Sequence, residues 1–297
     1  MGDSFRIIAI DTSSRSVSVA VLDGEKVLFE LDSQDFLKQI PRDEVGESLS
    51  AGNAGSGDKL PFGYVKKRSK RGSKTSRVFA PGASILLAPM IQKVLRESEM
   101  KIQDFELVAI SVGPGMFTGL RVGVVTAKSL AYSIGADLIG VNTLEVIAGQ
   151  TACTLGLEPN GIPEDCVIKP VLNAQRKQLF SGSFKFDATQ PFDWKLNQLA
   201  PDEILARNEW IENLRPADVV CGPGLEPILD QLKMDQPEVT VAPKEDWDCS
   251  ATSVGRLAYS QYKAGKRDDL WKLEPVYFRP SAAEEVRSSK LKNTMPQ

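Results

Sequence analysis

The clearest pattern at the start of the chain is a set of short apolar runs separated by turn residues. Residues 5–10 are mostly apolar, residues 17–21 alternate valine with smaller side chains, and residues 27–31 form a third run. Alternation with a period of two is typical of a half-buried strand, and a short continuous apolar run is typical of a strand buried on both faces. We therefore predict three short strands joined by tight turns, with Gly24 in the second turn.

This pattern disappears between about residues 36 and 82, where Gly, Ser and charged residues dominate. Residues 59–77 hold eight Lys or Arg and no Asp or Glu, so this run carries a local charge of +8. Because the whole chain has a net charge of −3, the remainder is acidic at −11. A segment with this composition is typical of a loop or a disordered insertion.

Helices and strands alternate again from about residue 84. Apolar residues at helical spacing predict a helix at 84–95, with Pro89 as a kink near its start. Residues 105–112 form an apolar strand that leads through a Gly-rich turn into a helix ending near residue 134, and residues 138–141 form another strand. The first part of the chain therefore follows the order β-β-β-α-β-α-β.

The second half predicts a similar mixture of elements. In chain order we expect a helix at 143–155, strands at 166–172 and 178–186, a helix at 202–214, a strand at 218–221, a helix after 222–224, a helix at 250–264 and an extended tail at 273–280. A strand followed by Gly-Pro-Gly and a helix occurs in both halves, at 112–115 and at 221–224. This repetition predicts two similar α/β domains that face each other across a cleft, with mixed sheets covered by helices.

The composition is that of an ordinary globular protein and excludes several kinds of active site. Of the 297 residues, 42% are apolar and 25% are charged. Because the chain contains no histidine, it cannot form a Ser-His-Asp triad, a Cys-His dyad or a His-ligated zinc site. Its four cysteines include no CxxC pair, so we expect free thiols and no metal site. Without a leader-like segment or a long apolar run, we expect a cytoplasmic protein with no membrane contact.

The first candidate site is the turn after the opening strand, which contains Asp11, Thr12 and Ser13. An Asp at a strand end, followed by hydroxyl residues, can hold a metal-bound water or meet a phosphate. The alternative is an Asx or Ser/Thr turn that only closes the hairpin. Phosphate-binding turns of this kind usually contain Gly, because its backbone N–H can approach the anion closely.

The second candidate is the Gly-rich turn that precedes the long helix of the first half. Its residues of interest are Gly113, Gly115, Thr118, Gly119 and Arg121. A helix N-terminus offers free N–H groups and positive dipole character, so this turn is a candidate anion or phosphate site. The spacing matches neither a P-loop nor GxGxxG. The alternative is a tight turn whose glycines let the helix pack closely on the sheet.

Small residues repeat every four positions along that helix: Gly119, Gly123, Ala127 and Ala131. Small residues in this register allow another helix to approach closely. We interpret this stripe as part of a partner interface, and packing on the chain's own sheet is the alternative. Three apolar residues of the preceding helix are added to the same candidate interface: Leu87, Met90 and Ile91.

The basic run is a candidate RNA contact. Its centre contains five closely spaced cations: Lys66, Lys67, Arg68, Lys70 and Arg71. Phe62 and Tyr64 lie beside them in the sequence, so bases could stack on the two rings while the cations meet phosphates. A solvated insertion without a specific ligand is the alternative.

Several of these motifs resemble one protein family. The matching stretches are residues 8–13, 111–131, 140–144, 171–176 and 273–279. The longest specific string is Gly-Pro-Gly-Met-Phe-Thr-Gly-Leu-Arg-Val-Gly at 113–123. Together they resemble TsaB, the YeaZ-like, glycoprotease-related family (peptidase M22) of tRNA threonylcarbamoyladenosine biosynthesis proteins. The likeness covers most of the chain outside the insertion.

The resemblance implies two domains of the actin/Hsp70/sugar-kinase (ASKHA) type. The first would span 1–141 with the insertion at 36–82, and the second, smaller one would span 142–297 with the C-terminal tail. It implies a non-catalytic activator of the related transferase TsaD, with the ATPase TsaE as a third component. That complex transfers a threonylcarbamoyl group to N6 of adenosine 37 in tRNAs that read ANN codons. We also expect a homodimer when the protein is alone, tRNA contact through the complex, and ATP or ADP only in the assembled complex.

The sequence departs from the family pattern at three places. Met116 stands where members typically carry Ser, Ala83 stands where they often carry His, and the insertion is unusual. The catalytic relative is expected to hold a metal through paired histidines, which this chain lacks. The alternative function is that of an ASKHA-type small-molecule kinase or nucleotide-binding protein, with Asp11 as a metal-linked acid. A kinase favours glycines after that Asp, whereas this chain has Ser13 and Ser14.

Overall fold

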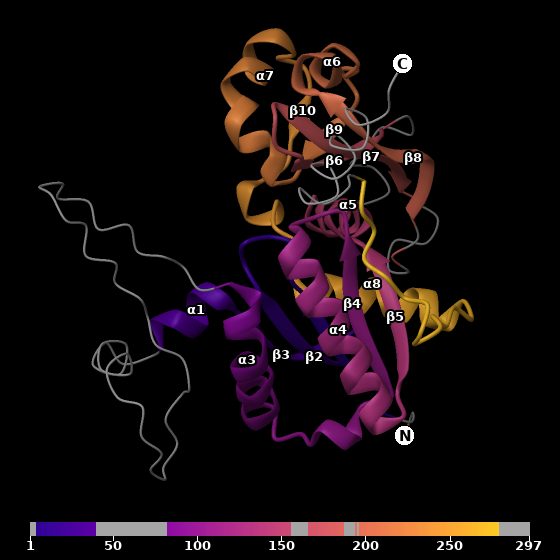
Figure 1. Cartoon of the computed structure of the whole chain (residues 1–297). Coiled ribbons are helices and arrows are strands. Elements are labelled where there is room, and N and C mark those ends of the chain that lie inside the picture. Colours follow the sequence, from indigo (N-terminus) through magenta and orange to yellow (C-terminus); the bar gives the residue numbers. More distant parts are fainter. Residues whose placement is uncertain (1–3, 40–81, 156–165, 187–193, 195, 279–297) are drawn as a thin grey trace, which may run out of the picture.

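The protein is built around two five-stranded sheets, one above the other in Figure 1. The computed structural model describes residues 4–39, 82–155, 166–186, 194 and 196–278. The basic run and most of the insertion around it therefore lie outside the described residues. None of the described helices is long and apolar enough to cross a membrane.

The first sheet has the strand order β3-β2-β1-β4-β5. Its strands are β1 (Arg6–Asp11), β2 (Ser18–Asp23), β3 (Lys26–Asp32), β4 (Leu107–Gly113) and β5 (Asp137–Asn142). Neighbours among β1, β2 and β3 are antiparallel, whereas β4 pairs in parallel with both β1 and β5. All five strands predicted from the first half of the sequence are confirmed.

The second sheet has the order β10-β9-β6-β7-β8. Its strands are β6 (Ile168–Asn173), β7 (Gln178–Phe186), β8 (Leu196–Ala206), β9 (Val219–Cys221) and β10 (Thr240–Val241). Here β6, β7 and β8 form the antiparallel part, and β9 and β10 add in parallel beside β6. From β8 to β10 this is the same succession as in the first sheet. The two similar α/β units predicted from the repeated Gly-Pro-Gly strings are confirmed in topology.

The helices form layers on both sheets. They are α1 (Ser33–Lys38), α3 (Ala83–Glu97), α4 (Phe117–Ile134), α5 (Thr143–Thr154), α6 (Arg207–Glu212), α7 (Leu229–Asp235) and α8 (Ala251–Lys263). Three short 3-10 helices complete the described elements: η1 (Ile102–Asp104), η2 (Pro223–Ile228) and η3 (Lys244–Asp246). Side chains of types that favour helix N-caps begin three of the helices, since Asp32 caps α1, Asn142 caps α5 and Ser250 caps α8.

Both faces of the first sheet are buried, and successive residues of β1 point to different cores. Ile8 and Ile10 belong to a core with α3 and α4. Ile7 and Ala9 belong to the other core, which also contains residues of α5, α8 and the second sheet. Figure 1 shows α5 between the two sheets and α8 beside β4 and β5. Two-sided burial explains why β1 is a continuous apolar run in the sequence.

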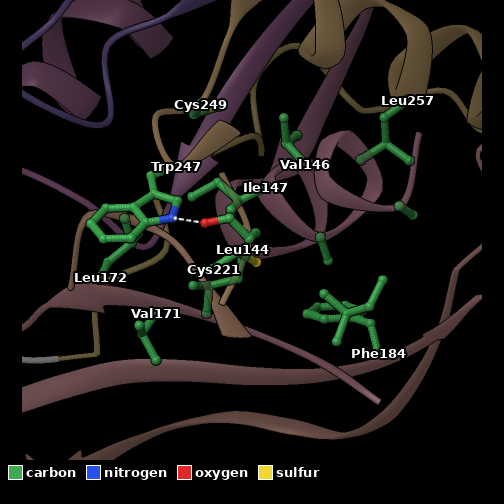
Figure 2. Packing of buried hydrophobic residues seen from close by; sticks show 14 of the residues in the cluster. Leu144, Val146, Ile147, Val171, Leu172, Phe184, Cys221, Trp247, Cys249 and Leu257 are labelled. Atoms are coloured by element: carbon green, nitrogen blue, oxygen red, sulfur yellow. Dashed lines mark hydrogen bonds between the residues drawn. The ribbon is translucent and has the colours of Figure 1, made fainter. Parts of the chain in front are cut away.

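The core between the sheets is dense with large side chains (Figure 2). Leu144 and Ile147 of α5 meet Val171 of β6 and Phe184 of β7 there. Trp247 fills the same core and satisfies its only polar atom, because its Nε1–H donates to the backbone oxygen of Ala242 at 2.9 Å. Burying an indole in this way requires such a partner. The core joins both halves of the chain into one packed body.

One predicted element is wrong. Residues 202–206 belong to strand β8 and not to a helix at 202–214, so only α6 (Arg207–Glu212) is helical there. β8 is an edge strand with mostly exposed side chains, and its sequence lacks the apolar alternation that marks a half-buried strand. Pro201 within it is tolerated because an edge strand needs fewer backbone donors. The short elements α1 and β10 were also not predicted.

The last part of the chain returns to the first sheet. The backbone N–H of Ala251, the first residue of α8, donates to Ser18 Oγ of β2 at 2.9 Å. Residues 266–278, here called the C-terminal strap, then follow β5 and α4 toward the second sheet, and Figure 1 shows this segment in yellow. Because α8 and the strap pack on the first sheet, a division of the chain at residue 141 stays a prediction.

Candidate functional site

Asp11 lies at the carboxyl end of β1, and only 1% of it is exposed. Its Oδ1 accepts hydrogen bonds from Ser111 Oγ at the end of β4 and from the backbone N–H of Ser13 at 3.2 Å. Its Oδ2 has no hydrogen-bond partner among the described residues. The bond to Ser13 is the Asx-type turn that the sequence allowed, and the bond to Ser111 joins two strand ends that are 100 positions apart.

The surroundings of Asp11 are polar but closed. Thr12 Oγ1 and Ser13 Oγ are also buried without a hydrogen-bond partner in the described part of the chain. Burial raises the pKa of Asp11, while the bonds from Ser111 and Ser13 lower it. The thiol of Cys249 lies beside the carboxyl group, and burial together with the Asp11 charge raises the pKa of Cys249 well above its ordinary value. This cysteine is therefore held as a thiol, which is a poor nucleophile. Sequence analysis missed Cys249, because nothing near it marks a site.

The Gly-rich turn and the Asp11 turn are brought together. The backbone N–H of Met116 donates to the backbone oxygen of Ser13 at 2.7 Å. A Cβ on Gly115 would overlap that same oxygen, and a Cβ on Gly119 would overlap the backbone oxygen of Thr12. The first turn of α4 thus rests directly on the turn that follows β1. Close packing accounts for both glycines, and phosphate contact by these residues stays a prediction.

Arg121 and Thr118 point away from this junction. Thr118 is exposed on α4. The Arg121 guanidinium lies 3.9 Å from the centre of the Phe117 ring, and its Nε donates to the Tyr277 hydroxyl of the strap at 2.9 Å. Phe117 and Tyr277 are themselves in ring contact at 4.7 Å. The cation proposed for a phosphate is therefore engaged by aromatic rings of its own chain.

The strap covers the edge of this site. Its Val276 N–H donates to the backbone oxygen of Val112 at 2.8 Å, and a Cβ on Gly113 would lie 2.9 Å from the Val276 oxygen. Further along, Lys128 Nζ donates to the backbone oxygens of Trp271 at 3.3 Å and Leu273 at 3.0 Å. Sequence analysis predicted an extended tail but not its place. Its place is set by Arg121, which contacts Tyr277, and by Lys128, which donates to backbone oxygens of the strap.

The residues assigned to a partner interface lie inside the chain's own core. Gly123 faces Thr12, since a Cβ there would overlap Thr12 Oγ1, and Ala127 and Ala131 are fully buried. The three α3 residues are buried in the same core: Leu87, Met90 and Ile91. Internal packing explains the stripe of small residues, so a partner on these helices would contact their other faces. Whether one does so stays a prediction. The five predicted RNA-contact residues lie outside the described residues.

The sequence of this chain is similar to proteins of tRNA threonylcarbamoyladenosine biosynthesis. Residues 80–209 match the family described as TsaD, tRNA N6-adenosine threonylcarbamoyltransferase. The chain is 30% identical over 135 residues to the tRNA threonylcarbamoyladenosine biosynthesis protein TsaB of Bacillus subtilis strain 168. The matched segment covers 46% of this chain and 52% of that protein. It is 28% identical over 139 residues to the tRNA N6-adenosine threonylcarbamoyltransferase of Thermodesulfovibrio yellowstonii, covering 47% and 33% respectively. The chain thus spans about half or less of the curated relatives it matches.

The fold is that of a solved relative. YeaZ from Pseudomonas aeruginosa superimposes with a TM-score of 0.61 over 92% of this chain and 100% of its own, at 16% sequence identity. This match, together with the two mixed sheets of equal topology, confirms the expected two-unit ASKHA-like α/β fold. In its matched sequence segments and in its fold, this chain is therefore similar to TsaB and YeaZ proteins.

Proposed function

We propose that this chain is a non-catalytic subunit of the machinery that adds threonylcarbamoyl to N6 of adenosine 37 in tRNAs reading ANN codons. Its partner would be a TsaD-like transferase, and a TsaE-like ATPase would complete the complex. The similarity to TsaB and to the transferase family supports a role in this tRNA modification. ATP or ADP and tRNA would then be bound by the assembled complex, and no cofactor would be held tightly by this chain.

The observation that carries the proposal is the outer face of α4. This helix of 18 residues contains only two charged residues, Arg121 and Lys128, and no acid. The strap engages both of them. The most exposed apolar side chains of the helix are Val125, which is 63% exposed, and Tyr132, which is 69% exposed. A helix face in contact with water normally carries charges, so a neutral and partly apolar face favours contact with another protein.

The neighbouring helix extends this surface. The exposed side of α3 begins with Ser84 and continues with Ala88 and Gln92, which are neutral as well. α3 and α4 pack against each other, so the neutral first part of the exposed side of α3 extends the neutral face of α4, whereas the last turn of α3 carries the exposed charges of Arg96 and Glu97. A second copy of the chain would use the same surface as the transferase. We therefore expect a homodimer when the protein is alone, which the transferase displaces.

The absence of catalysis is supported by the residues at Asp11. The chain has no histidine, so imidazole cannot serve as a metal ligand or as a general base. The Asp11 carboxyl group is closed off by Ser111, Ser13 and Cys249, and the turn after it contains no glycine that lets a phosphate approach the backbone. These features disfavour a kinase with Asp11 as its metal-linked acid.

The proposal is tested with one exposed substitution on α4 and a matched control. Val125→Glu places a charge on the neutral face, and Met234→Glu places the same charge at an 82% exposed position on α7, in the second half of the chain. Each full-length variant is mixed with the TsaD-like transferase of the same organism, and association is measured by light scattering and calorimetry. Because a charge at the centre of an interface is desolvated, we expect Val125→Glu to weaken association at least tenfold and Met234→Glu to leave it unchanged.

Activity is read from the same samples. Threonylcarbamoyl transfer to tRNA, reconstituted with the transferase and the ATPase, should need this chain and should fall with Val125→Glu. The chain alone should transfer nothing. Transfer by the chain alone that Asp11→Ala abolishes would contradict a non-catalytic role, and unchanged association of a folded Val125→Glu variant would contradict the α4 surface.

A further inference from the structure

The exposed apolar side chains of the protein gather where the C-terminal strap follows α4. Residues 271–277 run antiparallel to the helix (Figure 1), and together with α4 we call them the α4–strap seam. Trp271 contacts Tyr132 near the end of α4, and Tyr277 contacts Phe117 at its start. Of nine large apolar side chains that are exposed among the described residues, six lie on the seam or at the N-cap of α4: Met116, Val125, Tyr132, Trp271, Val276 and Tyr277.

Val125 connects the two ends of the seam. Residues three and four positions apart lie on the same side of a helix, so Arg121, Val125 and Lys128 share one side of α4. The strap contacts that side before and after Val125. Arg121 Nε donates to the Tyr277 hydroxyl at 2.9 Å, and Lys128 Nζ donates to the Leu273 backbone oxygen at 3.0 Å. The exposed apolar side chains therefore form one patch, and such patches mark sites of contact with another molecule.

The cations of the seam favour a protein over a nucleic acid as that molecule. Arg121 lies over an aromatic ring and donates to a phenol hydroxyl, and Lys128 donates to two backbone oxygens of the strap. Lys272 lies 3.7 Å from a carboxylate oxygen of Asp269. RNA phosphates bind cations that can turn toward them, and these three are already engaged within the chain. Exposed Trp and Tyr together with Arg are typical of the centre of a protein interface.

The charge of the seam favours a different protein over a second copy of this chain. The seam contains three cations, Arg121, Lys128 and Lys272, against one acid, Glu274, although the whole chain has a net charge of −3. In a symmetric homodimer this patch would meet itself, so cations would face cations. A different protein can place carboxylates around the same apolar centre, which avoids that repulsion. The difference gives a physical reason for the transferase to displace a second copy.

We infer that the α4–strap seam is the centre of the surface that binds the TsaD-like transferase, and that Trp271 is its anchor in an apolar pocket rimmed by carboxylates. This inference rests on the proposed function and adds the strap to a contact assigned above to the helices. Trp271 is 74% exposed. Its backbone is held on both sides, because its N–H donates to Asp269 Oδ1 at 2.8 Å and its oxygen accepts from Lys128 Nζ at 3.3 Å. A large ring presented on a fixed backbone loses little conformational freedom on binding.

The tryptophans of the chain provide the probe for a test. The structure describes all four of them, and three are buried: Trp194, Trp210 and Trp247. In the full-length chain labelled with 5-fluorotryptophan, a soluble paramagnetic reagent should therefore broaden one fluorine signal strongly, and Trp271→Phe assigns that signal. We expect the unlabelled transferase of the same organism to reduce this broadening about tenfold or more. Excess tRNA without the transferase, or a higher concentration of the chain alone, should leave Trp271 exposed.

Two substitutions then measure what the ring contributes to binding. Trp271→Ala removes the ring but keeps both backbone contacts, so we expect association with the transferase to weaken about tenfold or more. Amide exchange at Val276 should stay unchanged, which shows that the strap is still in place. Leu199→Ala is the matched control, because it removes an exposed apolar side chain from β8 and should leave association unchanged.

The outcomes separate this inference from the proposed function. If Val125→Glu weakens association but Trp271 stays exposed in the complex, or Trp271→Ala binds with native affinity, the assignment of the seam is overturned and the proposed function stands. Absence of any association with the transferase overturns both. Protection of Trp271 in the chain alone assigns the seam to a second copy or to another segment of this chain, and protection by tRNA alone assigns it to RNA. Either result overturns the inference.

Discussion

The backbone oxygen of Thr12 occupies the place that a side chain on Gly119 would need. Thr12 follows β1 and Gly119 lies in the first turns of α4, so this contact joins two motifs that are far apart in the sequence. Below it, Asp11 and Ser111 join the ends of β1 and β4 by a hydrogen bond. The packing of α4 on this turn fixes the helix whose outer face we assign to a partner.

Gly119→Ala tests this packing. The added methyl group would overlap a backbone oxygen, which cannot move aside as the end of a flexible side chain can. We expect a loss of about 1–3 kcal/mol in the free energy of unfolding, as for other overpacked sites. Denaturant unfolding measures it. Gly82→Ala is the control, since nothing lies within 4 Å of its Cβ and its φ of −84° suits any residue. Equal stability of the two variants would show that α4 can shift on the turn.

Glu145 should make stability depend on pH. Its pKa is raised in the folded protein to about 7, so the folded state keeps a proton that the unfolded chain loses above its ordinary value of 4.5. Stability from this group is then fully present at low pH and is lost as the pH rises to about 7. The difference between the two pKa values of Glu145 corresponds to roughly 3 kcal/mol in the free energy of unfolding, and to less if the residues around Glu145 rearrange when it ionises.

Glu145→Gln removes this dependence. Urea unfolding at pH 5 and pH 8 should give the variant nearly native stability at the lower pH and greater stability than the native sequence at the higher one. Glu203→Gln should follow the native sequence at both. If Glu145→Gln were instead destabilised at pH 8, the ionised carboxylate would be favourable and its attraction to Lys266 would outweigh burial.

We expect the contacts of Tyr277 with α4 to contribute most of the stability of the strap in its observed position. Tyr277→Phe removes the hydroxyl that accepts from Arg121 but keeps the ring contacts, whereas Tyr277→Ala removes both. A solvent-accessible hydrogen bond and a cation–π contact each contribute about 0.5–1 kcal/mol. Amide exchange at Val276, whose N–H is bonded to Val112, should therefore quicken modestly in the first variant and more in the second. Equal exchange in both would assign the strap's stability to Lys128 and Leu273 instead.

The parts of the fold that could be predicted from sequence are those whose burial is regular. β1 is apolar on both faces, and α4 ends at Gly135 with a φ of 70°, so pattern and cap mark the boundaries of these elements. β8 was missed because an exposed edge strand has no reason to alternate apolar and polar residues. Its helix-forming residues, such as Glu203 and Leu205, are overridden by pairing with β7.

The candidate site was predictable only in part for a different reason. Asp11 and the glycines at 113–119 form local motifs, so they could be recognised, but their mutual contact depends on the parallel pairing of β1 with β4. Cys249 reaches Asp11 from a segment more than 200 residues later. Small residues such as Gly123 and Ala127 fit an interface and a core equally well, and only the folded structure, in which Gly123 faces Thr12 and Ala127 is buried in the core, decides between them.

The basic run at residues 59–77 should add affinity for tRNA without sequence preference. Its eight cations stand on an otherwise acidic chain, so attraction to phosphates would be local. If about half of them meet phosphates, the logarithm of affinity should fall with the logarithm of salt concentration at a slope of about −3. Raising salt from ~50 to ~200 mM would then weaken this contribution by on the order of 10²-fold. Deleting 59–77 and titrating the assembled complex with tRNA at both concentrations measures it.

A second variant separates charge from length. Replacing five cations with Gln keeps the segment but removes most of its charge: Lys66, Lys67, Arg68, Lys70 and Arg71. Electrostatic binding predicts that this variant loses nearly as much affinity and slope as the deletion, because phosphate contacts need charge and reach more than fixed geometry. If Phe62 and Tyr64 contribute by stacking on unpaired bases, the Gln variant should retain a salt-independent remainder that the deletion lacks. Unchanged affinity and slope in both variants would assign all tRNA contact to the other subunits.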